Sequence, residues 1–129
     1  MKATIVKIGG TEYYLAFTGT VMFEIREKYG GAEELLEQFK GDSRESFNII
    51  CETIALLAEQ GEMTRRHLGY DHNKIITAEV IQNLVQPSDI PVFINSIIRA
   101  IELGFGREIN PEDEGDIDLV LAEIEKKTR

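Results

Sequence analysis

Two adjacent glycines, Gly9 and Gly10, separate two short runs of apolar and β-branched residues between Ile5 and Phe17. This arrangement is typical of a β-hairpin, because Gly-Gly supplies the positive φ angles of a two-residue turn. In the register that this turn dictates, Lys7 lies opposite Glu12. One face of the predicted hairpin then carries Val6, Ile8, Tyr13, Leu15 and Phe17. A lone hairpin is marginally stable in water, so we expect it to pack on helices or, through its two open edges, to pair with another chain.

The same glycines raise the alternative of a phosphate-binding loop. Such a loop needs a following Gly-Lys-Ser/Thr, or three spaced glycines that open a helix. Here a second strand follows Gly10, and the glycines at 104 and 106 follow a predicted helix instead of opening one. The glycines therefore indicate a turn and do not indicate a nucleotide site.

Beyond Phe17 the apolar period changes from two to about 3.6, which predicts helices. Thr20 is the expected N-cap of the first helix, Asp42 and Glu45 form an expected capping box, and Gly61 is an expected helix end. Residues 62–74 break the period and are expected to form a loop with at most one helical turn. The predicted helices cover residues 21–29, 32–39, 43–60 and 78–85 (capped by Thr77), a helix capped by Ser88 or Asp89 with Pro91 in its first turn that runs to about Leu103, and Asp116 to about Lys127.

These elements predict a single α+β fold that is mainly α, with the N-terminal β-hairpin packed on a bundle of five or six helices. We expect residues 1–105 to form the hairpin plus helical domain. Residues 106–129 are expected to form an acidic linker and a C-terminal amphipathic helix. The helix that ends near Leu103 leaves only a narrow polar stripe, so something must cover nearly all of its surface.

Composition excludes several classes of function. The chain has 129 residues and a net charge of −9, and it carries no basic cluster of the kind that binds nucleic acid. No segment approaches the roughly 20 apolar residues of a membrane span. A single cysteine, Cys51, fits a reducing cytoplasm.

The residues that could carry chemistry are few. His67, Tyr70, Asp71 and His72 could ligate zinc if their loop folded back, but no second cluster of Cys or His completes the site. A calcium loop beginning at Asn110 lacks its final bidentate glutamate. The serines lie at helix caps or within helices, where no strained turn would activate them. We therefore predict a protein that is not an enzyme, with no catalytic, cofactor-binding or metal-binding residue.

The class of function that remains is binding to another protein. Apolar faces around Ile54 and Ile97 could form a groove for another protein, or each could cover another face within one monomer.

The order of these elements resembles the tail assembly chaperones of long-tailed phages and prophages. The resemblance covers about residues 3–105: the hairpin "IVKIGGTEYYLAFT", the helix "VMFEIREKYGG", the short "AEELLEQFKG" segment and the apolar helix "SFNIICETIALLAEQG". It implies a non-enzymatic protein of the bacterial host cytoplasm that binds the tape measure protein and tail tube subunits during tail morphogenesis. Further copies of the chain are another candidate partner. Two alternatives stay open: a structural tail or head-completion protein, or a small metal-dependent regulatory protein using His67, Asp71 and His72.

Overall fold

The computed structural model of the chain describes residues 1–106 and 116–119. Its first strands, β1 (Lys2–Ile8) and β2 (Thr11–Leu15), form the predicted hairpin in the predicted register, with Lys7 opposite Glu12. Gly9 and Gly10 have φ angles of 58° and 83°, in the left-handed region that this turn requires. The local pattern was therefore sufficient to predict the hairpin.

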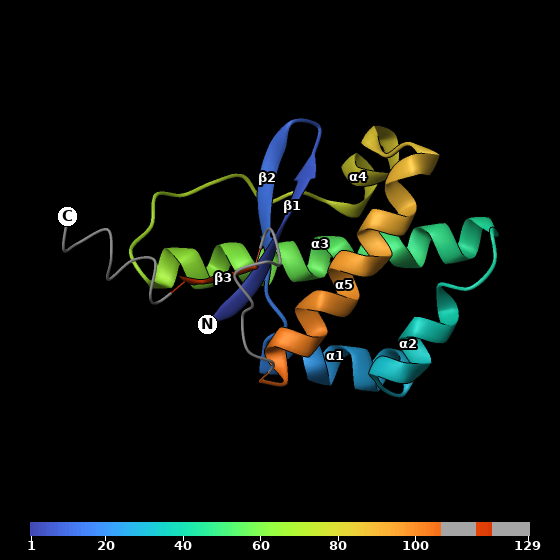
Figure 1. Cartoon of the computed structure of the whole chain (residues 1–129), viewed down its shortest axis with the longest axis horizontal. Helices are drawn as coiled ribbons and strands as arrows, with labels where there is room; N and C mark the ends of the chain where they lie inside the picture. The colour runs from blue at the N-terminus through green and yellow to red at the C-terminus, as the bar shows by residue number, and fades with distance from the viewer. Residues whose placement is uncertain (107–115, 120–129) are drawn as a thin grey trace.

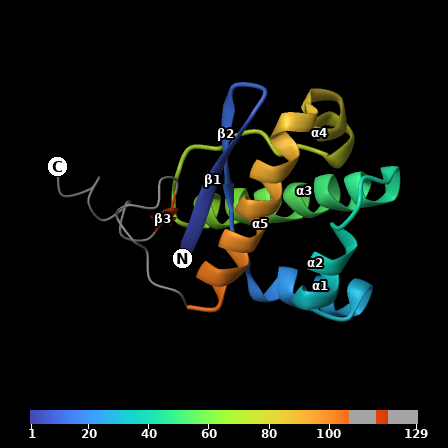
Figure 2. The same ribbon diagram turned by 45° about the vertical axis from the view of Figure 1, so that its right-hand side comes forward.

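Five α-helices follow within the described residues, and one short 3-10 helix lies among them (Figures 1 and 2). They are α1 (Gly19–Tyr29), α2 (Ala32–Gln38), α3 (Arg44–His67), α4 (Ala78–Leu84), η1 (Pro87–Asp89) and α5 (Ile90–Gly104). The hairpin crosses α3, α5 runs alongside β1, and α1 and α2 lie together at one side of the molecule (Figures 1 and 2). The fold is α+β and mainly α, as expected.

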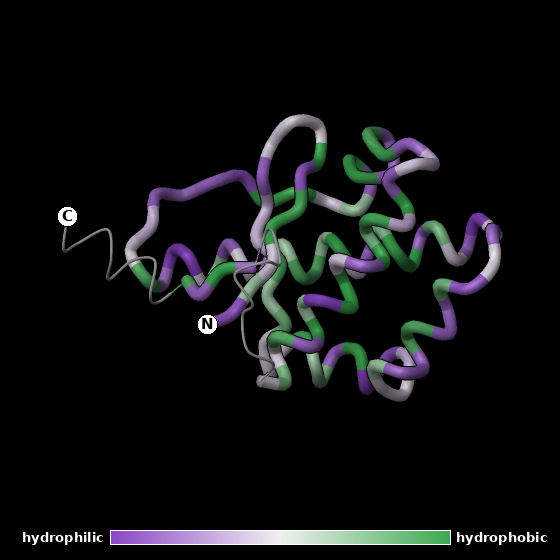
Figure 3. Tube along the Cα trace, viewed as in Figure 1, coloured by the Kyte–Doolittle hydropathy of each residue, from purple (hydrophilic) through white to green (hydrophobic). Residues whose placement is uncertain are grey.

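The inner face of the hairpin, α3 and α5 form the main core. Of the five side chains predicted for this face, Tyr13 is partly buried and the others are buried. They pack with the apolar stripes of α3 and α5, and Figure 3 shows the hydrophobic segments meeting there. Burial of these stripes explains why both helices are stable in this arrangement.

The long helix α3 corrects two expectations. It does not end at Gly61 but continues to His67, so only residues 68–77 form the loop before α4. Gly61 lies against the backbone of β2, where a Cβ atom would be 1.7 Å from the carbonyl oxygen of Tyr14. This glycine therefore allows a helix to approach a strand closely, which is a different use of glycine from ending a helix.

Two helix starts also differ from expectation. Thr18, not Thr20, caps α1 by accepting a hydrogen bond from the Val21 N–H. Ser43, not Asp42, caps α3 by accepting from the Ser46 N–H. Serine and threonine satisfy the same unpaired N–H groups as aspartate, so neighbouring candidates cannot be separated by residue type alone.

The prediction of a helix that begins at Asp116 is wrong for its first residues. Asp116–Asp118 form a strand, β3, which pairs antiparallel with β1 and makes a three-stranded sheet of order β2-β1-β3. The edge of β1 that was expected to be open is thus occupied. The rest of the predicted helix, 120–127, and the linker 107–115 lie outside the described residues.

A second, smaller core lies on the other face of the sheet. Ala3, Ala16 and Leu119 are fully buried there, with Tyr14, Leu68 and Ile117 packed against them. The other edge of the hairpin meets α3, since the Ala16 N–H donates to the carbonyl oxygen of Leu57.

Candidate functional site

The apolar faces around Ile54 and Ile97, one candidate for a partner-binding groove, are buried. Ile54 and Ile97 each have 0% of their area exposed, because the apolar faces of α3 and α5 cover one another and the hairpin. These faces therefore form the interior of one monomer, which is the simpler of the two arrangements left open by the sequence.

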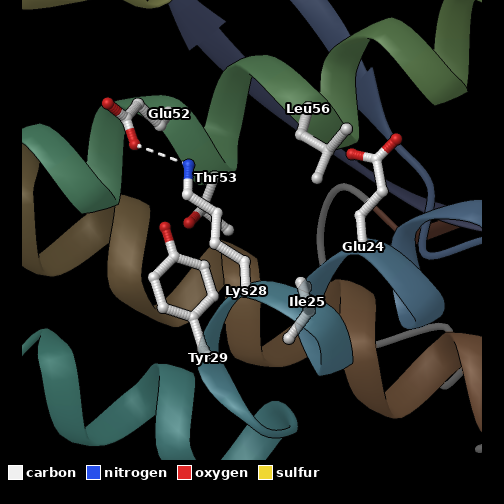
Figure 4. A pocket seen from close by; sticks show the side chains of 7 residues that line it. All are labelled: Glu24, Ile25, Lys28, Tyr29, Glu52, Thr53 and Leu56. Atoms are coloured by element: carbon white, nitrogen blue, oxygen red, sulfur yellow. Dashed lines mark hydrogen bonds and ion pairs between the residues drawn. The ribbon is translucent and has the colours of Figure 1, made fainter.

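A groove lies between α1 and α3 (Figure 4). Ile25 and Thr53 are buried and make its base, while exposed Glu24, Lys28 and Glu52 stand at its rim. Tyr29 and Leu56, both half-buried, complete the lining. The groove has a volume of about 210 Å³.

Helical spacing brings these side chains together. Glu24 and Lys28 are four residues apart on α1, as are Glu52 and Leu56 on α3, so each pair lies on one face of its helix. Gly30 then ends α1 with φ 102°, and its N–H donates to the carbonyl oxygen of Arg26. This turn begins directly after Tyr29, so Tyr29 occupies the last position of the helix.

The rim of the groove is charged and accessible to solvent. Lys28 Nζ lies 3.5 Å from Glu52 Oε2 and 5.6 Å from the centre of the Tyr29 ring. The pKa of Lys28 is raised chiefly by Tyr29 and further by Glu52, against the opposing effect of burial. Both partners of this ion pair are well exposed, so the pair contributes little to stability. A charged group of another molecule could therefore replace Lys28 or Glu52 in the pair at little cost.

The groove is small and its base is largely apolar. Its volume is below the roughly 300–1,000 Å³ usual for sites that hold a cofactor or a drug-sized ligand. The Thr53 hydroxyl already donates to the carbonyl oxygen of Ile49 at 2.7 Å. No lining residue is a histidine, cysteine or serine. The groove can take one or two side chains of a docked segment, with an apolar base and carboxylates beside it.

The histidines of the hypothetical zinc site lie elsewhere. His67 is the last residue of α3, and Asp71 and His72 lie on the following loop, all three exposed. In the part of the chain that the structure describes, no group of three or more His, Cys, Asp or Glu side chains is placed to hold a metal ion. His72 instead borders a more open cleft between β2 and the loop, lined by Thr11, Glu12, Tyr14, His72, Asn73 and Lys74.

The loop is held to α3 by a buried charge cluster that sequence reasoning missed. Glu62 accepts hydrogen bonds from Arg65 Nη1 at 2.7 Å, Arg66 Nε at 2.8 Å and the Asn73 N–H at 2.8 Å. The Arg65 guanidinium lies 4.9 Å from the ring centres of both Tyr14 and Tyr70. The signal was the i, i+3 and i, i+4 spacing of Glu62 to the two arginines, which reads as helical once α3 is known to continue through Gly61.

Comparison with known proteins adds no assignment, because no protein-family model, curated protein or solved structure matches the chain. Across residues 1–106 and 116–119, none of the helices combines the length and apolar character needed to span a membrane.

Proposed function

We propose that this chain is a non-enzymatic tail assembly chaperone of a phage or prophage. It works in the bacterial host cytoplasm by binding the tape measure protein and tail tube subunits. The order of elements over residues 3–105 supports the proposal, and the observation that carries it is the acid-rimmed groove between α1 and α3.

The groove suits the side chains of an amphipathic helix. An apolar side chain of the partner would enter above Ile25 and Leu56. A lysine or arginine one helical turn away would meet Glu24 or Glu52 at the rim, and Lys28 would be released from Glu52. A long, unassembled tape measure protein presents many such helices, and each would lose exposed apolar surface on binding.

The outer surface of α2 fits the same role. On α2, the glutamates Glu33, Glu34 and Glu37 are all exposed, while Leu35 is buried and Leu36 half-buried. With a net charge of −9, a complex coated by such chains repels its neighbours and stays dispersed.

The direct test is co-expression with the tape measure protein encoded in the same phage or prophage. We expect the wild-type chain to raise the soluble fraction of that protein and to co-purify with it. The double variant Glu24→Lys, Glu52→Lys reverses the charge of both rim carboxylates and should lose this effect by tenfold or more.

The matched control is Glu27→Lys, Glu59→Lys, which changes the net charge equally on the same two helices at exposed positions outside the groove. It should act as wild type. Equal loss in both variants would show that only net charge matters. No gain in solubility with the wild-type chain, or the chain itself found in purified particles, would contradict the chaperone proposal and favour a structural role.

A further inference from the structure

The small strand β3 closes the sheet from a distant part of the sequence. Lys2 pairs with Asp118, Ala3 with Ile117 and Thr4 with Asp116, so the two strands are more than 110 residues apart in the chain. Beyond them, the Leu119 N–H donates to the carbonyl oxygen of Met1 at 2.8 Å. All the described contacts of β3 are thus with elements that any second copy of the chain also has.

The attachment of β3 combines apolar packing with two ion pairs: the N-terminal ammonium of Met1 lies 3.3 Å from Asp118 Oδ1, and Asp116 pairs with Arg99. Ile117 and Leu119 pack in the small core with Ala3 and Ala16. Asp116 Oδ2 lies 2.7 Å from Arg99 Nη2 and 2.8 Å from Arg99 Nε, with only 1% of the Asp116 side chain exposed. The Tyr70 hydroxyl donates to the carbonyl oxygen of Leu119.

The contact between Asp116 and Arg99 leaves one carboxylate oxygen of Asp116 without a partner among the described residues. That oxygen, Oδ1, is buried. A buried carboxylate oxygen without a partner loses its hydration without compensation, which offsets part of the gain from Arg99. A strand of three residues with such an anchor opens more easily than the main core does.

Opening β3 would uncover the unpaired edge of β1, with Ala3 and Ala16 beside it. An exposed edge of this kind pairs readily with another strand. The strand that fits it best is one with the same Asp-Ile-Asp-Leu sequence, because every contact described above can form again. Exchange requires the nine residues that join Gly106 to β3 to reach the second molecule, and a chain of that length spans at most about 30 Å when extended.

We propose that the β1 edge is an exchange site for β3, and that its second occupant is the β3 strand of another copy of this chain. Two molecules that exchange β3 form a dimer without any new type of contact, which is the low-cost route to a dimer through domain swapping. The acidic rim of the α1–α3 groove takes no part in this exchange. The inference therefore stands independently of the proposed function.

Cysteine pairing tests the exchange with full-length chains. Since hydrogen-bonded pairs alternate along an antiparallel ladder and Leu119 bonds to Met1, Lys2 and Asp118 form a non-hydrogen-bonded pair with Cα atoms about 4.5 Å apart. A disulfide fits that distance. Chains carrying Lys2→Cys are mixed with chains carrying Asp118→Cys, at increasing concentration, and then oxidised.

We expect a disulfide-linked heterodimer whose yield rises with concentration and exceeds several-fold that of a control mixture of Lys7→Cys with Asp118→Cys. Lys7 is on β1 but faces Glu12 of β2 in the register and not β3. In the double variant Lys2→Cys, Asp118→Cys, an intrachain disulfide should form at low concentration. The inference fails if the mixed variants give no more heterodimer than the control. It also fails if the double variant forms no intrachain disulfide, since β3 would then not lie on β1.

Discussion

Gly61 is the residue that lets α3 pack closely against β2. It lies within α3, where a helix interior normally disfavours glycine by about 1 kcal/mol relative to alanine. Here the lack of a side chain lets the helix backbone touch the Tyr14 carbonyl of β2. Gly104 has the same role on α5, where a Cβ atom would come within 2.7 Å of Phe17. Two helices thus come close to β2 and to Phe17 through glycine.

We predict that Gly61→Ala lowers the free energy of unfolding by about 2–3 kcal/mol, because the new methyl group forces α3 away from β2. Gly19→Ala is the matched control. Gly19 is the first residue of α1, and a Cβ atom there would meet nothing within 4 Å. Urea unfolding of both variants checks the prediction, and equal stability of the two would contradict it.

Cys51 gives a second prediction for a single residue. Its side chain is fully buried, and burial together with the nearby Glu52 carboxylate raises the pKa of the thiol to about 11. The thiolate, which is the reactive form, is therefore scarce at pH 8. We expect Ellman's reagent to react with Cys51 in guanidinium chloride within seconds and in the native protein only as fast as the protein opens. Rapid reaction of the native protein would show that the site is accessible.

At the scale of the helix, the start of α1 is held by a side chain that also bridges to α3. The Thr18 hydroxyl oxygen accepts from the Val21 N–H and donates to Gln60 Oε1 at 2.8 Å. We predict that Thr18→Ala lowers the free energy of unfolding by about 1 kcal/mol or slightly more. Thr20→Ala, at the exposed position two residues on, should change it by less than about 0.5 kcal/mol. Thermal melts of the two variants check this order. A lower melting temperature for Thr20→Ala than for Thr18→Ala would mean that Thr20 is the cap.

The elements that could be predicted from sequence are those with local causes. The hairpin register followed from a two-residue turn and a period of two, and the Thr77 cap of α4 followed from one side chain and the N–H three residues on. The strand β3 has no local cause, since Asp116–Asp118 is a strand only because β1 lies beside it. Likewise, the groove depends on how α1 lies against α3, and nothing in the sequence near Lys28 indicates that Glu52 will face it.

At the scale of the molecule, the cluster around Glu62 joins parts that are far apart in the chain. Its arginine Arg65 lies between Tyr14 of β2 and Tyr70 of the loop, and Tyr70 in turn holds Leu119 after β3. Glu62 and Arg65 are only 5% and 7% exposed. Loss of one partner would leave the other charge buried without compensation.

We therefore predict that Glu62→Gln lowers the free energy of unfolding at pH 7 by about 3 kcal/mol. Glu59→Gln, an exposed change on the same helix, should alter it by less than about 0.5 kcal/mol. Chemical denaturation of both variants gives the comparison, and the loop should lose protection from hydrogen exchange only in Glu62→Gln.

The carboxylate of Glu62 also makes the free energy of unfolding depend on pH. Burial alone would raise the pKa of Glu62, but hydrogen bonds from the Asn73 N–H, Arg66 and Arg65 outweigh that effect and hold the pKa below its ordinary value. Because the folded state binds this proton less tightly than the unfolded state, the stabilisation is complete above the ordinary glutamate pKa of about 4.3. It is lost as the pH falls through the lower pKa of the folded state.

The difference in unfolding free energy between wild type and Glu62→Gln isolates this carboxylate from the other acids, which titrate alike in both chains. We expect that difference to be constant from pH 8 to about 5 and to shrink at lower pH. Urea unfolding midpoints at each pH measure it. A difference that grew on acidification would mean that the folded state holds the Glu62 proton more tightly than the unfolded state, so that burial and not the arginine contacts controls the cluster.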